Sequence, residues 1–243
     1  MSLPFFYIER YEGSMQTISL DEDNSRHIVQ VLRMQAGEQL NLTDGKGYSI
    51  IADIQDAHKK HCLVRVVSSE RTMQPPRHTS IAISLIKNSA RFEWFLEKAT
   101  EMGVSTIIPL ICVRTEKQKF RWDRMKSILV SAMLQSQQYW LPVLHEPAAF
   151  DRFVDSSKAA QKFIAYCQGD SRKELSESID VQASSQLILI GPEGDFTKEE
   201  IERAINQHFI PVSLGPTRLR TETAGVVAAT LLRLGGIHFA TSD

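Results

Sequence analysis

The sequence predicts an α/β fold with a mostly parallel sheet, preceded by a small β-barrel. In the first part of the chain, apolar and polar residues alternate over short segments, as in strands with one buried face. After residue 80 the pattern changes to short continuous apolar runs separated by helical repeats, as in parallel strands covered on both faces. We therefore expect a barrel domain over residues 1–70 and an α/β domain over residues 77–243, joined by a polar stretch with prolines.

Residues 38–67 indicate the barrel. Three short segments there alternate between apolar and polar residues, and a turn with two glycines at residues 44–47 joins the first two segments. Alternation of this kind suits a small antiparallel barrel. Residues 24–34 are expected to form a short helix packed against it.

Five apolar runs indicate the parallel sheet. Between the first two, residues 92–99 place apolar side chains at helical spacing, and Gly103 stands where that helix would stop. A second helix is expected from about residue 122 to residue 138, because Pro142 follows it. The expected strands are residues 81–86, 106–111, 163–167, 187–190 and 210–214.

The composition excludes several classes of protein. Hydrophobic residues make up 42% and charged residues 23% of the chain, which argues against disordered and fibrous proteins. No stretch approaches the roughly 20 uncharged apolar residues of a membrane span, and the start lacks the pattern of a secretion signal, so we expect a cytoplasmic protein. The three cysteines are far apart and outside metal-ligand spacing, so we expect neither disulfides nor a metal site.

Positive charge gathers in the middle of the chain. The formal net charge is -1, but residues 77–126 contain ten Lys and Arg against five Asp and Glu. Six basic residues of this segment form a cluster that is able to bind phosphate groups: Arg114, Lys117, Lys119, Arg121, Arg124 and Lys126. A solvated helix face explains the same cluster, so both interpretations stay open.

A glycine loop follows the expected strand at residues 187–190. It reads Gly191-Pro192-Glu193-Gly194-Asp195, and Thr197 with Glu200 forms a capping box that opens the next helix. Ligands of open α/β sheets bind beyond the carboxyl ends of the strands, where glycines let the backbone come close. Taken alone, this loop suits a cofactor site or a plain tight turn.

A second glycine loop covers residues 214–224, again after a strand and before a helix. Two such loops can form one pocket. Thr221 or Thr223 is expected to cap that helix, with Glu222 near its positive end. Arg220 gains nothing from the helix dipole, which indicates a ligand or an ion pair instead. The dinucleotide-binding fingerprint is absent from both loops.

Six sequence elements then carry a more specific resemblance. They are Arg26-His27-Ile28 with Val31-Leu32-Arg33-Met34, Glu97-Lys98-Ala99-Thr100-Glu101-Met102-Gly103-Val104, Arg114-Thr115, Gln135-Ser136 with Leu141-Pro142, Ile190-Gly191-Pro192-Glu193-Gly194, and Leu214-Gly215 with Leu219-Arg220-Thr221-Glu222-Thr223-Ala224. In these elements the chain resembles the ribosomal RNA uridine-N3 methyltransferases of the RsmE type, within the SPOUT superfamily. The resemblance covers nearly the whole chain.

The resemblance implies a PUA-like barrel that helps to hold RNA, followed by a SPOUT domain tied in a deep trefoil knot. It implies S-adenosyl-L-methionine as the cofactor, 16S ribosomal RNA or the small ribosomal subunit as the partner, and a homodimer without metal or membrane. Carried over by position, the expected cofactor contacts are Ile190, Gly191, Glu193, Gly194, Leu214, Gly215, Leu219, Arg220, Thr221, Thr223 and Ala224, with the loop after Cys167 as a third wall. The expected RNA contacts are Arg26, Arg33, Arg114, Lys117, Lys119 and Arg121.

Three positions depart from the family pattern. Asp195 stands where the family usually has glycine, and Gln138 and Thr217 stand where arginine is common, although Arg218 lies next to Thr217. We expect these changes to affect RNA contacts more than cofactor binding. Individual phosphate contacts add to affinity separately and carry no base specificity, so a subgroup can exchange them.

The expected reaction is an in-line displacement in which uridine N3, having lost its proton, attacks the methyl group of the cofactor. Arg220 is the expected catalytic cation for the uracil oxygens, and Glu222 is expected to receive or relay the proton. A role as a first-turn carboxylate explains Glu222 equally well. Two alternatives remain open: a non-catalytic RNA-binding ribosome-assembly factor, and a SPOUT methyltransferase that acts on a ribose hydroxyl or on transfer RNA.

Overall fold

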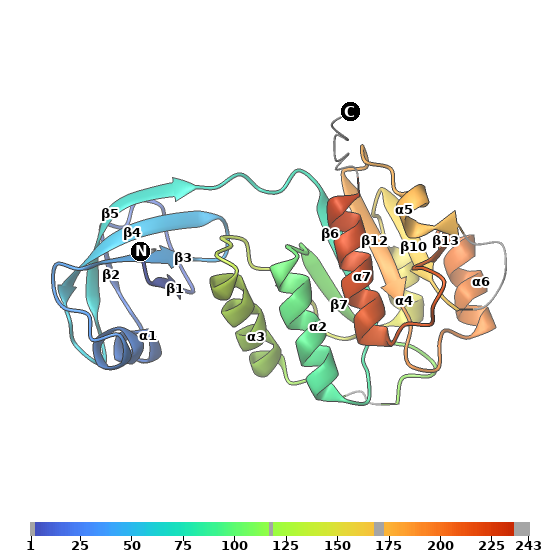
Figure 1. Cartoon of the computed structure of the whole chain (residues 1–243), viewed down its shortest axis with the longest axis horizontal. Helices are drawn as coiled ribbons and strands as arrows, with labels where there is room; N and C mark the ends of the chain where they lie inside the picture. The colour runs from blue at the N-terminus through green and yellow to red at the C-terminus, as the bar shows by residue number, and fades with distance from the viewer. Residues whose placement is uncertain (1–2, 117–118, 168–172, 236–243) are drawn as a thin grey trace. The chain divides into compact units, whose positions relative to one another are not determined.

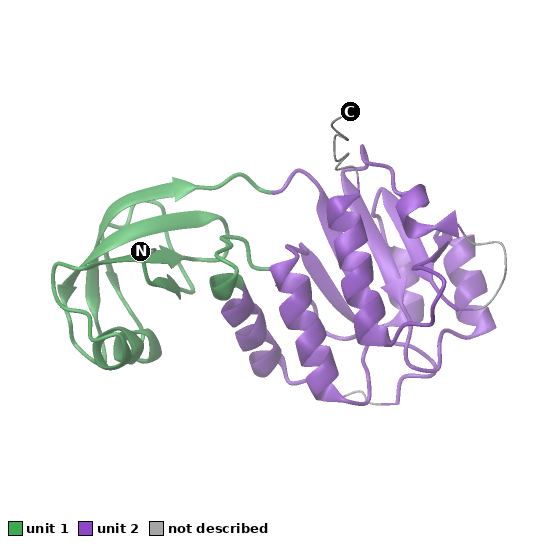
Figure 2. Ribbon diagram, viewed as in Figure 1, with its two compact units in different colours: residues 1–74, 133–141 green, residues 75–132, 142–243 purple. Residues whose placement is uncertain are grey.

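The computed structural model describes residues 3–116, 119–167 and 173–235. It divides into two compact units, residues 1–74 with 133–141 and residues 75–132 with 142–243 (Figures 1 and 2). Residues 133–141 belong to the first unit, whereas the sequence pattern predicts them in the second domain. No helix among the described residues is long and apolar enough to cross a membrane.

The first unit contains one five-stranded sheet. Its strands are β1 (Phe5–Tyr7), β2 (Thr17–Ser19), β3 (Gln39–Thr43), β4 (Tyr48–Asp56) and β5 (Leu63–Arg71), in the spatial order β1-β3-β4-β5-β2. The alternating pattern works as expected, because Ile50, Ala52 and Ile54 of β4 are all fully buried. The three strands expected over residues 38–67 pair antiparallel, as predicted, whereas β1, which the sequence did not predict, pairs with β3 in parallel. β1 and β2 have three residues each and are too short to show an alternation in sequence.

The helix expected at residues 24–34 is shorter and begins earlier. It consists of α1 (Glu22–Arg26) followed by one π-helical segment, η1 (His27–Val31). The start is fixed by Asp21, whose side chain accepts a hydrogen bond from the Asn24 backbone N–H. Ile28 is fully buried in the core of the sheet's apolar face.

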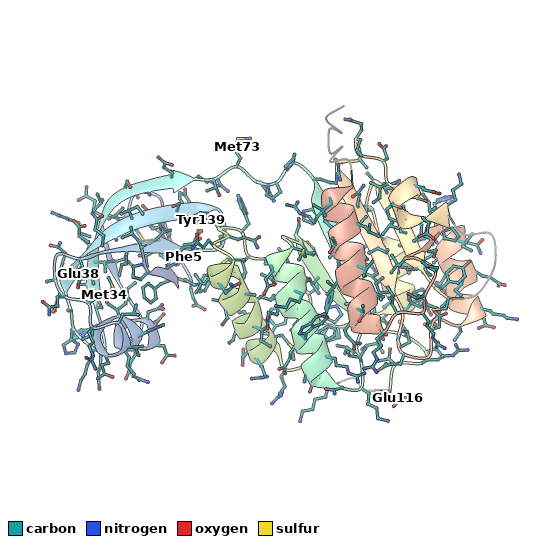
Figure 3. The ribbon with its side chains drawn as sticks, viewed as in Figure 1. Phe5, Met34, Glu38, Met73, Glu116 and Tyr139 are labelled. Carbon is teal, nitrogen blue, oxygen red and sulfur yellow. The ribbon has the colours of Figure 1, made fainter. Side chains whose placement is uncertain are left out.

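The segment at residues 133–141 belongs to the first unit because its backbone bonds to the turn between β3 and β4. The Gly47 N–H donates to the Tyr139 carbonyl at 2.8 Å, and the Leu141 N–H donates to the Gly45 carbonyl at 2.8 Å. The rings of Phe5 and Tyr139 pack with their centroids 5.3 Å apart (Figure 3). Gly47 has φ +98°, and a Cβ there would lie 2.4 Å from the Trp140 ring. No local sequence pattern predicts this contact between residues 139–141 and the turn at residues 45–47.

The second unit contains one parallel sheet, as predicted. Every recorded pairing between its strands is parallel, and the spatial order is β11-β13-β10-β12-β6-β7-β8, with β9 also paired to β7. The strands are β6 (His78–Ser84), β7 (Thr106–Ile111), β8 (Val143–Leu144), β9 (Ala148–Ala149), β10 (Gln161–Ala165), β11 (Lys173–Glu174), β12 (Ser185–Ile190) and β13 (Ile210–Ser213).

Helices cover both faces of this sheet (Figure 1). They are α2 (Ser89–Glu101), α3 (Trp122–Gln135, whose last residues belong to the first unit), α4 (Phe150–Ser156), α5 (Leu175–Ser178), α6 (Lys198–Asn206) and α7 (Thr221–Leu234). Leu187 and Leu189 of β12 share a buried cluster with Phe150 of α4 and Ala204 of α6. α7 packs on the other side, against β6, β12 and α2. Burial on both faces explains why these strands are continuous apolar runs.

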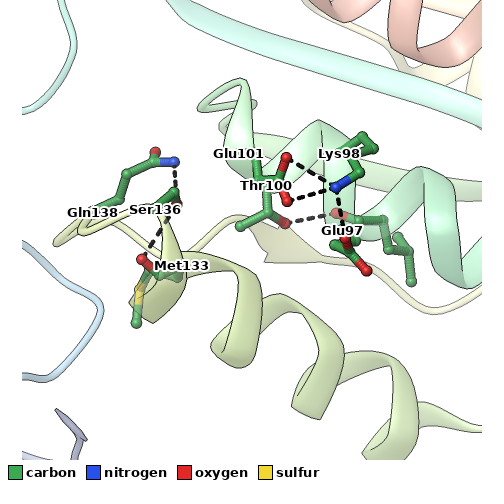
Figure 4. A network of polar contacts seen from close by, with 8 residues as sticks. Glu97, Lys98, Thr100, Glu101, Met133, Ser136 and Gln138 are labelled. Atoms are coloured by element: carbon green, nitrogen blue, oxygen red, sulfur yellow. Dashed lines mark hydrogen bonds and ion pairs between the residues drawn. The ribbon is translucent and has the colours of Figure 1, made fainter. Parts of the chain in front are cut away.

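The motif at residues 97–104 has a structural explanation. It is the end of α2, where Lys98 bonds Glu97 at 2.6 Å and Glu101 at 2.9 Å (Figure 4). The buried Thr100 hydroxyl donates to the Leu96 carbonyl. Gly103 follows in the left-handed conformation with φ +73°, as expected for a helix end. The motif therefore serves the helix and its termination.

Candidate cofactor cavity

Three neighbouring strands of the second unit end at one edge of the sheet. β10 lies between β12 and β13, and all three run parallel (Figure 1), so their carboxyl ends at Ala165, Ile190 and Ser213 face the same way. The segments that follow them enclose a cavity of about 790 Å³. This volume lies within the range of pockets for small molecules and cofactors. The two glycine loops found in the sequence thus line a single cavity.

Most of the predicted cofactor residues line this cavity. They are Ile190, Gly191, Glu193, Leu214, Gly215, Leu219, Arg220, Thr221 and Ala224, whereas Gly194 and Thr223 are not among the lining residues. Ala165, Tyr166 and Cys167, at and just beyond the end of β10, line the cavity, whereas the loop after Cys167 that was predicted as a third wall, residues 168–172, lies outside the described part of the chain. Arg91 of α2 also lines the cavity, although no sequence pattern indicated it.

The turn after β12 is shaped by two residues with special backbone requirements. A Cβ on Gly191 would lie 3.2 Å from the ring of the buried Phe196. Asp195 has φ +65°, a left-handed conformation that aspartate tolerates better than most residues. The expected capping box follows, because Thr197 and Glu200 bond each other's backbone N–H.

Glu200 does more than cap this helix. Its side chain is buried, and its second oxygen accepts a hydrogen bond from the Val113 N–H at 2.9 Å. The Thr115 hydroxyl in the same segment accepts from the Cys112 N–H at 2.8 Å and bonds the Ser84 hydroxyl at 2.9 Å. These buried bonds fix the segment after β7, which carries Arg114, against the turn after β12.

The loop after β13 leaves backbone groups available to a ligand. Gly215 has φ +121° with no atom within 4 Å of the position of a Cβ. Among the recorded hydrogen bonds of the described residues, none engages the backbone N–H of Leu214 or Leu219. Since both residues line the cavity, these two amides are able to hydrogen-bond a bound molecule.

The start of α7 differs from the prediction. Thr221 is already helical, the N-cap residue is Arg220, and no side chain caps the first turn, so neither Thr221 nor Thr223 is the capping residue. No capping side chain therefore accepts a hydrogen bond from the backbone N–H groups of the first turn of α7. This leaves the positive end of α7 beside the cavity.

Two arginines and one carboxylate stand at this helix start. Glu222 is 7% exposed, and its carboxylate lies 3.6 Å from the Arg91 guanidinium. Arg220 is exposed and lines the cavity, and no ion pair or hydrogen bond of its side chain is recorded among the described residues. The sequence left a ligand or an ion pair open for Arg220, and no ion-pair partner is found for it in the described part of the chain.

The predicted RNA-binding residues differ in their surroundings. Arg114 donates to the carbonyls of Gly194 at 2.6 Å and Phe196 at 3.3 Å, and Arg121 lies 3.8 Å from Glu93. Arg26 is paired with Glu22. Lys117 lies outside the described residues. Arg33 and Lys119 are exposed, and no ion pair of either is recorded in the described part of the chain.

The helix face in the basic segment is partly neutralised. Arg124 of α3 bonds Glu93 of α2 through two nitrogens, at 2.7 and 2.6 Å. These hydrogen bonds from Arg124 hold the pKa of the Glu93 carboxyl below its usual value. The contacts of Arg121 and Arg124 with Glu93 therefore agree with a solvated, ion-paired face rather than with free phosphate-binding groups.

A cavity beyond the carboxyl ends of parallel strands, lined by two glycine loops and a helix N-terminus, defines an α/β protein that binds a small cofactor. Comparison with known families agrees: the profile of an RNA methyltransferase domain matches residues 73–233, and that of an RNA methyltransferase PUA domain matches residues 20–67. The chain belongs to the RsmE-type family of RNA methyltransferases.

Three relatives illustrate the match. The ribosomal RNA small subunit methyltransferase E of Synechocystis is 32% identical over 87% of this chain and 71% of its own length. The crystal structure of a probable rRNA methyltransferase from Porphyromonas gingivalis is 39% identical, with a TM-score of 0.86 and coverage of 93% and 95% of the two chains. A putative methyltransferase from Legionella pneumophila, solved with S-adenosylmethionine, is 31% identical, with a TM-score of 0.85 and coverage of 96% and 98%.

Proposed function

We propose that this protein transfers the methyl group of S-adenosyl-L-methionine to N3 of a uridine in 16S ribosomal RNA. One observation carries the proposal: the segments after β10, β12 and β13 enclose one cavity, and both glycine loops line it. The Synechocystis relative is named as a methyltransferase of small-subunit ribosomal RNA, which supports the choice of RNA. The resemblance in the six sequence elements supports the choice of uridine N3.

The residues of the cavity fit S-adenosylmethionine, which a solved relative holds. The cofactor has a purine, a sulfonium and a charged amino-acid end. Main-chain N–H groups at Leu214 and Leu219 suit the polar edge of a purine, and apolar side chains such as Ile190 and Leu219 suit its faces. The carboxylates of Glu193 and Glu222 bring negative charge to a cavity that takes a cation.

The bound cofactor supplies an activated methyl group, and the protein supplies position and charge. The uridine loses its N3 proton, the bond from N3 to the methyl carbon forms, and the bond from that carbon to sulfur breaks. Arg220 stabilises the negative charge that spreads over the uracil oxygens, because no carboxylate among the described residues forms an ion pair with it. Glu222 accepts the N3 proton, and Arg91 holds its carboxylate in place.

Glu222→Gln is expected to reduce the turnover number about a hundredfold and to leave the dissociation constant of S-adenosylmethionine within about threefold, because the amide keeps the shape but cannot accept the proton. Single-turnover methylation and calorimetric titration measure the two quantities. An unchanged rate removes Glu222 from the mechanism and leaves it as a carboxylate at a helix start. Glu202, an exposed residue of α6, provides the control Glu202→Gln.

Of the predicted RNA contacts among the described residues, Arg33 and Lys119 are those whose side chains have neither an ion pair nor a hydrogen bond recorded, so their charges are available to phosphate groups. Arg33→Ala is expected to weaken RNA binding severalfold and to reduce the slope of log affinity against log salt by about one. Arg26→Ala is the matched comparison, because Arg26 is already paired with Glu22. Binding measured at several salt concentrations checks this, and an unchanged affinity and slope for Arg33→Ala excludes the contact.

We also infer from the resemblance a deep trefoil knot in the second unit, a homodimer and a cytoplasmic location. Light scattering of the purified protein tests the dimer. In the sheet, β10 lies between β12 and β13, which both follow it in the sequence. The chain must therefore cross over β10 beside the cavity, and this crossing supports the proposed knot.

The proposed reaction is tested by mapping modified bases. Mass spectrometry of 16S RNA from cells that lack the gene, compared with complemented cells, is expected to show the loss of one methyl group on a uridine base. A lost methyl on ribose or on transfer RNA favours the alternative target. If no RNA modification changes and the pure protein does not bind S-adenosylmethionine, the chain is a non-catalytic RNA-binding factor.

A further inference from the structure

Asp195 connects two walls of the cofactor cavity. It lies in the turn after β12, and its carboxylate oxygen Oδ2 accepts a hydrogen bond at 2.9 Å from the backbone N–H of Cys167, beyond the end of β10. The other oxygen, Oδ1, accepts from the backbone N–H of Phe196 in its own turn at 2.9 Å. Both Asp195 and Cys167 line the cavity.

The turn is also held from a second direction. The Arg114 guanidinium donates to the carbonyls of Gly194 and Phe196, which flank Asp195. Arg114 therefore joins this turn to the segment after β7, while Asp195 joins it to the segment after β10. Bonds that involve a charged group are stronger than neutral ones, so these two side chains fix the turn on both sides.

The backbone of Asp195 favours a role for its side chain. A residue other than glycine at φ +65° has a conformational cost, which glycine would avoid. Aspartate adopts this left-handed conformation less readily than glycine, and the two hydrogen bonds of its carboxylate offset the conformational cost.

We propose that Asp195 is a positioning residue, whose carboxylate sets the spacing between the walls after β10 and β12 and thereby prepares the cavity for S-adenosylmethionine. This role rests on the proposed function of the cavity. Without the carboxylate, the Cys167 N–H loses its partner in the turn and the two walls separate more readily. Cofactor binding must then order them, which lowers affinity and leaves the chemical step intact.

Asp195→Gly is the sharpest variant, because glycine adopts the same backbone conformation and removes only the carboxylate. Asp195→Asn keeps one acceptor oxygen and tolerates the left-handed conformation, so it is expected to rescue part of the loss. Asp155→Asn is the matched control. Asp155 is a partly exposed carboxylate on α4 that pairs with Arg203 and does not line the cavity.

Cys167 provides a readout at the wall itself. It is exposed, whereas Cys62 and Cys112 are buried. Burial raises the pKa of the Cys112 thiol to about 12, so this thiol is inert toward alkylation in the folded protein. Iodoacetamide is therefore expected to label Cys167 first, and S-adenosylmethionine is expected to slow this labelling in the unmodified protein.

The experiment combines calorimetric titration with S-adenosylmethionine, methylation kinetics, thermal unfolding and the labelling rate of Cys167. For Asp195→Gly we expect about a tenfold rise in the dissociation constant and in KM for S-adenosylmethionine, which corresponds to the loss of one charged hydrogen bond. The value of kcat at saturating cofactor stays within about twofold. Labelling of Cys167 without cofactor becomes faster, and Asp195→Asn lies between Asp195→Gly and the unmodified protein.

Two results overturn this role. An unchanged dissociation constant in Asp195→Gly does so, and so does a fall in kcat and melting temperature that matches the fall in affinity, because that pattern indicates general damage. Asp155→Asn must behave like the unmodified protein in all four measurements. If the unmodified protein itself does not bind S-adenosylmethionine, the proposed function fails, and this outcome is distinct from failure of the Asp195 variants.

Discussion

Replacing Arg220 by alanine is expected to lower the rate of methyl transfer at least about a hundredfold, the usual effect of removing one group that stabilises developing negative charge. Arg220 is the N-cap residue of α7, is exposed and lines the cavity. No ion pair of its side chain is recorded among the described residues, so its charge is available to the substrate. The dissociation constant of S-adenosylmethionine is expected to change much less than the rate.

Single-turnover methylation of RNA and calorimetric titration measure these two effects. Arg203→Ala is the control, because Arg203 on α6 pairs with Asp155 and does not line the cavity. An Arg220→Ala variant that retains a rate within about threefold of the unmodified protein contradicts the assignment. A loss of cofactor binding as large as the loss of rate would place Arg220 with the cofactor alone.

Replacing Gly225 by alanine is expected to lower the free energy of unfolding by about 1–3 kcal/mol, the usual cost of inserting a group into a well-packed core. Gly225 lies on the buried face of α7, and a Cβ there would stand 2.6 Å from the ring of Phe95 and 2.9 Å from the Cδ1 atom of Ile83. Phe95 is fully buried, and side chains in a close-packed core have little room to move. Because α7 carries Arg220 and Glu222 at its start, a shift of this helix also disturbs the cavity.

The direction in which Gly225→Ala changes the free energy of unfolding distinguishes two explanations. Helix propensity alone predicts that alanine stabilises a helix by about 1 kcal/mol relative to glycine. Close packing of α7 on α2 and β6 predicts the opposite sign. Chemical denaturation of the two proteins decides between them, and a Gly225→Ala variant that is as stable as the unmodified protein excludes the close packing.

The parallel sheet and the two glycine loops could be predicted from the sequence because their signals are local. A strand buried on both faces is a continuous apolar run, as in β12, and a capping box needs only Thr197 and Glu200. The very short strands β8, β9 and β11 have two residues each and contain no period that a sequence pattern could reveal. They form because longer neighbouring strands supply their partners.

Other parts of the site depend on contacts between distant residues. Arg91 reaches Glu222 across 131 positions of the sequence, and Asp195 meets Cys167 because β10 and β12 are neighbours in the sheet. The predicted capping residue of α7 is wrong. Thr221 and Thr223 are of a type that often caps helices, but the helix already begins at Thr221. A positive φ at Asp195 is likewise a property of the folded turn.

A crystal structure of the protein grown with S-adenosylmethionine would show directly whether the three segments form the cofactor site. We expect one cofactor molecule in contact with the segments after all three strands β10, β12 and β13, including the main-chain N–H groups of Leu214 and Leu219. A cofactor bound elsewhere, or a cavity closed by protein atoms in that crystal, contradicts this expectation.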